Sequence, residues 1–262
     1  MAGERRFAER LADVARAETL TRAGLALEAE NKGGPGAYDP VTEADREAER
    51  AMRALIEADY PDHGISGEEF GDKPARGSLT WSLDPVDGTR AFVCGMPTWV
   101  TLIALLEHGA PRLGIIDAPR LDERYIGEIA GDKEGGCWLN GQPIRTSGCR
   151  SVSKARLSTT DPFLFQGDEE AAFARVRNRV RTARYSADGY AYARLAAGSI
   201  DLVIENGLKP HDYNALIPVV RGAGGMIGDW QGGSDFAEGR VLAAASAELF
   251  AEAVALLNGE QA

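Results

Sequence analysis

The N-terminal part of the chain has a hydrophobic pattern typical of helices. Apolar residues recur there at helical spacing, at Phe7, Leu11, Val14 and Ala15. This spacing predicts an amphipathic helix over residues 4–30, ended by the GGPG cluster of residues 33–36. A second helix is predicted to begin after Thr42. The Thr42 side chain can cap this helix, and Asp45 can reach back to complete a capping box. Pro61 ends the helix.

From residue 79 onward, short apolar runs separated by turn residues predict strands. These runs read LTWSL, TWVTLIALL, RLGIID and RYIGEIA. After residue 155, strand-like runs alternate with helical patterns over residues 169–180, 190–197, 213–221 and 248–257. Such alternation predicts a mixed α/β fold in which helices cover sheets. The small, polar residues 147–153 indicate a seam, which divides the chain into an N-terminal α+β half (1–147) and a C-terminal α/β half (148–262).

The composition is that of a folded globular protein. Hydrophobic residues make up 44% and charged residues 26% of the chain, which argues against disorder. The formal net charge of -11 argues against binding a nucleic-acid backbone or an anionic membrane through bulk electrostatics. We therefore expect neither a nucleic acid nor a membrane as partner.

The cysteines and the N-terminus indicate a cytoplasmic protein. Cys94, Cys137 and Cys149 are sparse and lack a CxxC spacing, as expected for reduced thiols. The N-terminal segment is charged throughout and lacks the apolar core of a signal peptide. No apolar run reaches the length of about 18 residues that a membrane span needs.

The strongest chemical signal is the segment WSLDPVDGTRAF, residues 81–92. A strand delivers Asp84 and a turn brings Asp87 back towards it, so the two carboxylates would repel each other unless a cation lay between them. Oxygen ligands favour Mg²⁺ or Mn²⁺ over zinc. The backbone amides of Gly88 and Thr89 could receive phosphate oxygens. Taken alone, DP and DG are also common turn dipeptides on protein surfaces.

Three further segments carry acidic residues. GEEF supplies Glu68 and Glu69, DPVTEAD supplies Asp39 and Asp45, and KPHD supplies Asp212 just before a predicted helix. A solvated loop or a helix cap could explain each segment separately. A purely structural account therefore requires several independent coincidences.

Together, and in this order, DPVTEAD, GEEFG, DPVDGT and the AGG of residues 223–225 resemble the inositol monophosphatase-like superfamily of metal-dependent, lithium-sensitive phosphatases. The resemblance covers nearly the whole chain and implies a layered αβαβα sandwich of sheets between helices. It also implies hydrolysis of a small phosphate monoester with two or three Mg²⁺ ions, for which Mn²⁺ could substitute. A homodimer is a further implication.

The resemblance implies a set of metal ligands. Glu68, Asp84 and the backbone carbonyl of Val86 would hold a first ion. Asp84, Asp87 and Asp212 would hold a second, and Glu68 would assist a more weakly bound third. In such two-metal catalysis one ion lowers the pKa of the attacking water and the other steadies the leaving oxygen.

The resemblance also implies how the water is oriented. Thr89 would do so, supported by Glu68 or by a network of Asp39, Thr42 and Asp45. A covalent intermediate is not expected, because the chain lacks a cysteine-phosphatase loop and its three histidines lie in turn-like segments.

Two departures from the inositol type resemble the histidinol-phosphatase branch. Residues 208–212 read LKPHD and residues 187–190 read ADGY, where inositol-type enzymes usually carry Trp-Asp and Gly-Ser-Ala. Asp188 and Glu205 would then bind the ammonium and imidazole groups of histidinol. Alternatively, Asp188 is a helix N-cap and Glu205 a surface residue at a strand end.

Several points stay open at this level. Tyr190 and Tyr192 could form an aromatic wall of the site or belong to the core, and no role is assigned to Lys32 or His211. The same chemistry could serve inositol 1-phosphate or a broad set of sugar phosphates. A metal-binding regulatory protein without catalysis is a further alternative, although the complete ligand set counts against it. A dinucleotide-binding oxidoreductase is disfavoured, because the glycine run at residues 222–225 follows a predicted helix rather than opening one.

Overall fold

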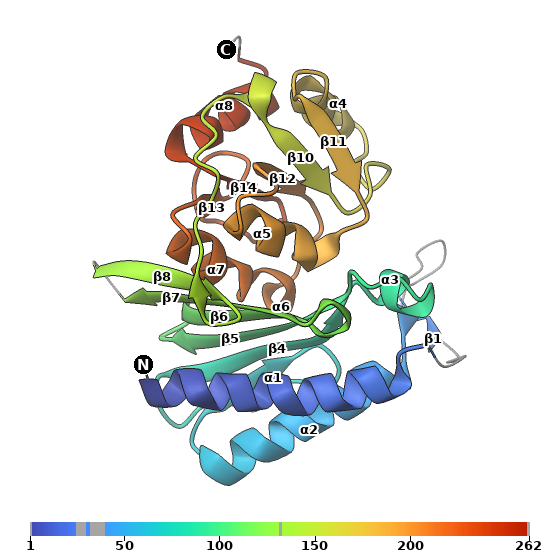
Figure 1. The fold of residues 1–262 in the computed structure, drawn as a ribbon, viewed down its shortest axis with the longest axis vertical. Helices are drawn as coiled ribbons and strands as arrows, with labels where there is room; N and C mark the ends of the chain where they lie inside the picture. The colour runs from blue at the N-terminus through green and yellow to red at the C-terminus, as the bar shows by residue number, and fades with distance from the viewer. Residues whose placement is uncertain (1, 25–29, 32–39, 131–132, 261–262) are drawn as a thin grey trace.

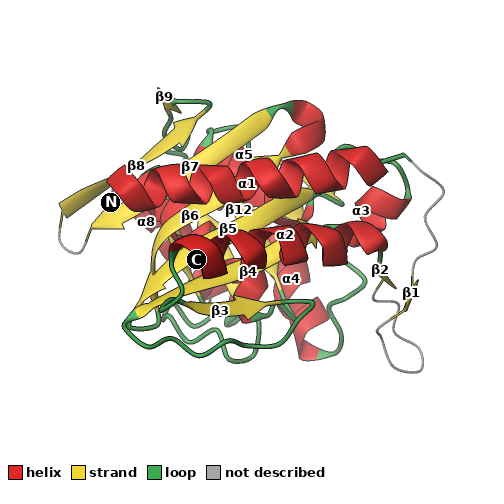
Figure 2. Ribbon diagram, turned by 90° about the horizontal axis from the view of Figure 1, so that it is seen from below, coloured by secondary structure: helices red, strands yellow, loops and turns green. Residues whose placement is uncertain are grey.

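A computed structural model describes residues 2–24, 30–31, 40–130 and 133–260 of the chain. Helices and sheets alternate in five layers (Figure 1), which confirms the predicted αβαβα sandwich. One outer layer consists of α1 (Ala2–Arg22) and α2 (Glu43–Asp59), which lie side by side across the first sheet (Figure 2). The other outer layer consists of α4 (Asp168–Arg177) and α8 (Ala247–Leu257).

The first sheet has the strand order β3-β4-β5-β6-β7-β8-β9. β3 and β4 are parallel, and the other neighbours are antiparallel. The strand bounds are β3 (Gly64–Gly67), β4 (Leu79–Asp87), β5 (Val100–Glu107), β6 (Ala110–Ala118), β7 (Glu123–Ala130), β8 (Lys133–Leu139) and β9 (Gln142–Pro143). The short helix α3 (Thr89–Val93) follows β4, and β1 (Glu30–Asn31) pairs with β2 (Pro40–Val41) outside the sheet.

The second sheet has the strand order β11-β10-β12-β14-β13. β10 is parallel to β11 and to β12, whereas β14 is antiparallel to both of its neighbours. The strand bounds are β10 (Arg156–Thr159), β11 (Thr182–Tyr185), β12 (Leu202–Glu205), β13 (Met226–Gly228) and β14 (Val241–Ala244). Short 3-10 helices cover Pro119–Leu121 and Val152–Lys154.

The middle layer holds the two sheets together. It consists of α5 (Asp188–Ala196), α6 (Pro210–Tyr213) and α7 (Leu216–Gly222). Because sheets lie on both sides of this layer, its helices bury apolar side chains in both directions. The resulting core cluster joins both sheets and includes Val100, Leu102, Leu195, Val203, Leu216 and Val219.

Several predicted helix ends were wrong. The first helix ends at Arg22 rather than near residue 30, and Gly24 behind it has a φ of 86°, a left-handed conformation common after helix ends. The helix predicted over residues 213–221 begins at Leu216, as α7, and Asp212, predicted to precede it, lies on a separate short helix, α6. The helix predicted over residues 190–197 begins two residues earlier, at Asp188. Tertiary packing and local turns decide these ends, which periodicity locates only to within a few residues.

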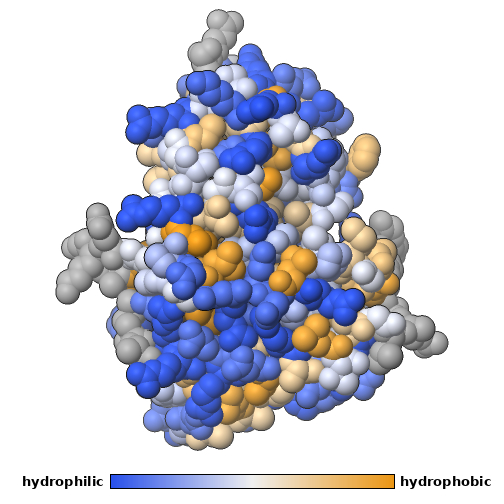
Figure 3. Space-filling model, in the orientation of Figure 1, coloured by the Kyte–Doolittle hydropathy of each residue, from blue (hydrophilic) through white to orange (hydrophobic). Residues whose placement is uncertain are grey.

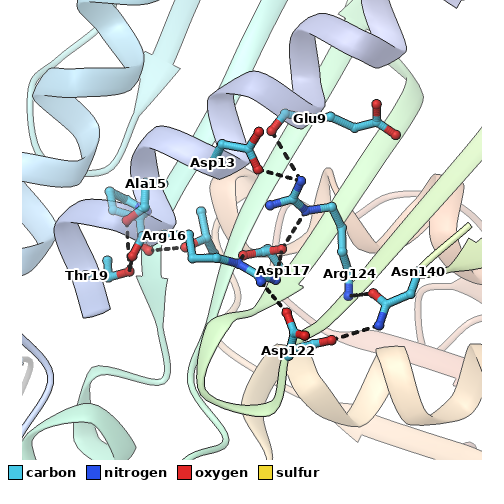
Figure 4. A network of polar contacts seen from close by, with 11 residues as sticks. Glu9, Asp13, Ala15, Arg16, Thr19, Asp117, Asp122, Arg124 and Asn140 are labelled. Carbon is cyan, nitrogen blue, oxygen red and sulfur yellow. Dashed lines mark hydrogen bonds and ion pairs between the residues drawn. The ribbon is translucent and has the colours of Figure 1, made fainter. Parts of the chain in front are cut away.

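A buried carboxylate fastens α1 to the first sheet (Figure 4). Asp117 on β6 is fully buried and accepts hydrogen bonds from Arg16 Nε at 3.0 Å and Nη2 at 2.9 Å. Arg124 Nε on β7 donates to the same carboxylate at 2.7 Å. Two guanidinium groups therefore compensate one buried charge, which makes the pair with Arg16 a specific attachment of α1.

Candidate metal and substrate site

An irregularity in β4 brings the first two carboxylates together. Asp84 pairs with Leu102, and Asp87 pairs with Val100. The two pairs are therefore three residues apart along β4 but only two residues apart along β5. In a regular strand, residues three apart point to opposite faces. The bulge removes this alternation, and it is held by hydrogen bonds from Thr101 Oγ1 to the Pro85 carbonyl and from the Val86 amide to Asp84 Oδ1.

The third carboxylate comes from the C-terminal half of the chain. Asp212 lies on the short helix α6, where its Oδ2 accepts a hydrogen bond of 2.6 Å from the Lys209 amide. Within the described residues, Asp84, Asp87 and Asp212 each offer an oxygen, and these three oxygens lie within 4.8 Å of one another. This is a spacing at which one cation can contact all three groups.

The electrostatics of this cluster favour a cation. Burial, followed by the neighbouring Glu68 and Asp87 carboxylates, raises the pKa of Asp84 well above its ordinary value. Burial and then the Asp188 carboxylate raise the pKa of Asp87 in the same way, and burial raises the pKa of Asp212. Three carboxylates that repel one another in a confined space fit a hard divalent cation such as Mg²⁺.

The capping box predicted at Thr42 is confirmed. Thr42 caps α2, and both its amide and its hydroxyl donate to Asp45 Oδ2, at 2.8 and 2.5 Å. Asp45 is buried, and burial raises its pKa to about 6. The hydroxyl of Thr89 lies 2.9 Å from the Val86 carbonyl and 3.4 Å from Asp45 Oδ1. The capping box of α2 therefore lies next to Thr89, two residues after Asp87.

A buried residue that sequence reasoning missed holds the GEEF loop. Glu49 on α2 is fully buried, and its carboxylate accepts hydrogen bonds from the amides of Glu69 and Phe70, at 2.7 and 3.2 Å. Arg53 Nε pairs with the same group at 2.7 Å. Glu49 lies on α2 one turn beyond Asp45, and this spacing was the available sequence signal. Helical spacing alone cannot show which loop a glutamate contacts.

A pocket beside the carboxylates, termed here the side pocket, contains both residues predicted to bind the alcohol moiety. It is lined by Asp87, Thr160, Asp188, Gly189, Tyr192, Glu205, Leu208, Asp212 and Leu216. Glu205 is buried rather than on the surface, and it accepts hydrogen bonds from Thr159 Oγ1 and from the Thr160 amide and hydroxyl. Burial raises the pKa of Glu205 to about 8.

Asp188 is the first residue of α5 rather than its N-cap, and it has a φ of 44°. Burial raises its pKa. A Cβ at Gly88 would lie 3.1 Å from Asp188 Oδ2, so the turn after Asp87 approaches this carboxylate closely. Gly88 itself has a φ of 83° and precedes α3, a conformation that favours glycine.

Of the remaining residues considered from the sequence, the structure describes Glu68 and His211. Asp39 and Lys32 lie outside the described residues. Glu68 adjoins β3, and its amide donates to the Leu83 carbonyl at 3.2 Å, next to Asp84 in the chain. His211 Nε2 lies 3.5 Å from Asp212 Oδ1. Thr159 and Thr160, which bind Glu205, were not predicted, since a pair of threonines at a strand end carries no specific sequence signal.

Comparison with known proteins decides the family. The model of the inositol monophosphatase family matches residues 4–261. The chain belongs to this family. The bifunctional phosphatase IMPL2 of Arabidopsis thaliana is 50% identical over 195 residues, which are 74% of this chain and 55% of that chloroplastic protein. A histidinol-phosphatase of Chlorobaculum parvum is 34% identical over 224 residues, 85% of each chain.

The fold agrees with this assignment. The structure of an inositol monophosphatase from Zymomonas mobilis matches with a TM-score of 0.86 and 40% identity, over 98% of each chain. Members of the inositol monophosphatase family are metal-dependent phosphatases of small phosphate monoesters, and this chain is a hydrolase of that kind. Among the described residues, no helix is both long and apolar enough to cross a membrane.

Proposed function

We propose that this protein is a Mg²⁺-dependent histidinol-phosphate phosphatase, which hydrolyses histidinol phosphate to histidinol and phosphate. The observation that carries the proposal is the position of Asp188 and Glu205 in one pocket with Asp87 and Asp212. The metal-ligand candidates and the candidate alcohol-binding carboxylates thus adjoin each other.

The donor set fits the proposed ions. Asp84, Asp87 and Asp212 would hold one Mg²⁺, and Glu68, Asp84 and the Val86 carbonyl another, with a third ion assisted by Glu68. Bound Mg²⁺ would supply the charge that makes water a nucleophile and stabilises the departing oxygen. The raised pKa of Asp84 and of Asp87 supports this assignment, because neutralising their mutual repulsion favours cation binding.

The hydroxyl of Thr89 would orient the attacking water. It lies within reach of Asp45 Oδ1 and of the Val86 carbonyl. When the hydroxyl donates to Asp45, its oxygen lone pairs face away from that carboxylate and can accept a hydrogen bond from water. Thr42 holds the Asp45 carboxylate in place through two hydrogen bonds, and the amides of Gly88 and Thr89 would contact the phosphate.

The substrate assignment rests on charge complementarity in the side pocket. Without a cation, burial raises the pKa of both Asp188 and Glu205, which disfavours the charged forms of these carboxyl groups. A substrate ammonium group would stabilise the ionised carboxylates, releasing protons, and would be bound by charge-assisted hydrogen bonds. A neutral polyol gains less from the same groups.

The test is phosphate release from histidinol phosphate and from inositol 1-phosphate, measured side by side in Mg²⁺ and in excess chelator. Chelator-sensitive preference for histidinol phosphate is expected. Asp188→Asn should raise the KM for histidinol phosphate more than that for inositol phosphate. Preference of the wild-type enzyme for inositol 1-phosphate would overturn the substrate assignment, and release from neither ester would favour a regulatory role.

A second candidate substrate class is inositol 1-phosphate or a range of sugar phosphates. The similarity to the Zymomonas mobilis inositol monophosphatase over 98% of both chains favours it. The same pair of assays distinguishes the two classes, because the proposed metal chemistry is common to them.

The remaining proposals concern organisation. The N-terminal half (1–147) would carry most metal ligands, and the C-terminal half (148–262) would supply Asp212 and the alcohol pocket.

We also propose a cytoplasmic homodimer. The face in Figure 3 is mainly hydrophilic with small hydrophobic areas, and large apolar side chains are exposed at Val93, Met96 and Phe163. Light scattering on the wild type and on Phe163→Asp would test the dimer.

A further inference from the structure

One tyrosine in the side pocket has a hydroxyl group without a partner. Tyr192 on α5 is 1% exposed, and its Oη has no hydrogen-bond partner among the described residues. Nearby tyrosines differ, since the hydroxyls of Tyr125 and Tyr190 both donate to Glu123, at 2.5 and 2.9 Å. A buried, unpaired hydroxyl is unfavourable and calls for a specific explanation.

The carboxylates that line the same pocket already accept hydrogen bonds from other groups. Tyr192 shares the side pocket with Asp87, Glu205 and Asp212. Asp87 accepts from the Gly189 amide, Asp212 from the Lys209 amide, and Glu205 from two threonines. An ordinary phenol is protonated at neutral pH, so the Tyr192 hydroxyl is a hydrogen-bond donor beside these carboxylates.

We infer that Tyr192 is a specificity-determining residue whose hydroxyl donates a hydrogen bond to an oxygen or nitrogen acceptor on the alcohol moiety of the substrate. The inference rests on the proposed phosphatase site and adds a donor to its two carboxylates. In histidinol the acceptor is the unprotonated imidazole nitrogen, and in a polyol it is a hydroxyl oxygen. The carboxylates would bind an ammonium group, and the phenol would bind a hydrogen-bond acceptor. Together they would select an alcohol that carries both groups.

The test is Tyr192→Phe, which removes only the hydroxyl. Its KM for histidinol phosphate is expected to rise by about three- to tenfold with kcat nearly unchanged, as for loss of one hydrogen bond. Its KM for phenyl phosphate, whose alcohol moiety has no acceptor beyond the ester oxygen, should not change. The Tm of the metal-free variant should equal or exceed that of the wild type, because no protein partner loses a bond.

Tyr125→Phe is the matched control. It removes a hydroxyl that has partners in Glu123 and Arg194 and lies outside the side pocket. This control should lower the Tm and leave the ratio of the two KM values as in the wild type. A lower Tm for Tyr192→Phe, or equal effects on both esters, would overturn the inference and indicate a structural role.

A second readout separates this inference from the proposed function. Calorimetric titration of histidinol and of inositol into the Mg²⁺-loaded protein measures binding of the alcohol without turnover. At least one alcohol should bind the wild type more tightly than Tyr192→Phe, even if histidinol phosphate is not the preferred ester. Equal affinities, or no binding of either alcohol to the wild type, would contradict a role for Tyr192 whatever the enzyme hydrolyses.

Discussion

The amide of Gly189 donates a hydrogen bond of 2.6 Å to Oδ2 of Asp87, 102 positions away in the chain. Asp87 ends β4 in the first sheet, and Gly189 lies in the first turn of α5 in the middle layer. This single contact connects a candidate metal ligand to the helix that carries Asp188 and Tyr192. The geometry of the candidate metal site therefore depends on how the middle layer packs on the first sheet.

A methyl group at position 189 should disturb this contact. A Cβ there would lie 2.6 Å from Asp87 Oδ2, closer than real Cβ atoms approach. Gly189→Ala is expected to weaken Mg²⁺ binding by about 10- to 100-fold, as for other changes next to a metal ligand. The measure is activity as a function of Mg²⁺ concentration. Gly77→Ala, where a Cβ meets nothing within 4 Å, is the control. An unchanged Mg²⁺ dependence in Gly189→Ala would contradict the prediction.

Removing the charge of Asp84 should have opposite effects on activity and on metal-free stability. Asp84→Asn is expected to lower kcat/KM by at least about 100-fold, since it removes the ligand proposed to bridge two ions. The same change relieves repulsion with Glu68 and Asp87, so the Tm without Mg²⁺ should not fall. Mg²⁺ should then raise the Tm of the wild type but not of the variant. The exposed Asp72→Asn should behave as the wild type.

The raised pKa of Glu205 predicts a pH dependence of stability. Its folded-state pKa is about 8, against an ordinary value of 4.5. Between these values the folded state binds the proton and the unfolded state does not, so rising pH lowers the free energy of unfolding. One group contributes at most about 1.4 kcal/mol per pH unit.

Glu205→Gln mimics the protonated group and removes this contribution. In the metal-free protein, the variant should gain stability relative to the wild type as pH rises from about 5 to 8. Urea denaturation at several pH values measures the difference. A difference that does not vary with pH would show that Glu205 titrates near its ordinary value in the folded protein.

The Asp117 network predicts a loss of stability without a catalytic effect. Asp117→Asn leaves Arg16 and Arg124 without their shared buried carboxylate and should cost about 3 kcal/mol of unfolding free energy. In the control, Asp62→Asn, the ion pair with Arg76 is largely exposed, and the cost should stay below about 1 kcal/mol. At temperatures where both variants are folded, kcat/KM should match the wild type. Equal denaturation midpoints for the two variants would refute the prediction.

The sequence was most informative where chemistry and local structure coincide. The capping box of Thr42 and Asp45 depends on residues three apart, so it could be predicted from the chain and is confirmed. The layered αβαβα fold followed from the family resemblance and is also confirmed. Helix ends were less predictable: the short helix α6, which carries Asp212, was not predicted, because a helix of four residues has too few positions for a hydrophobic period.

The sequence by itself determined which groups can bind a divalent cation, since Asp84, Asp87 and Asp212 are acceptors wherever they lie. Only the tertiary structure decided that they meet. A bulge had to turn Asp87 to the side of Asp84, and packing of the middle layer had to bring α6 to the first sheet. Burial likewise decided the raised pKa of Glu205, the hydrogen bonds that Glu49 accepts and the unpaired hydroxyl of Tyr192. Burial and long-range contacts depend on how distant segments pack together, and periodicity along the chain does not specify that packing.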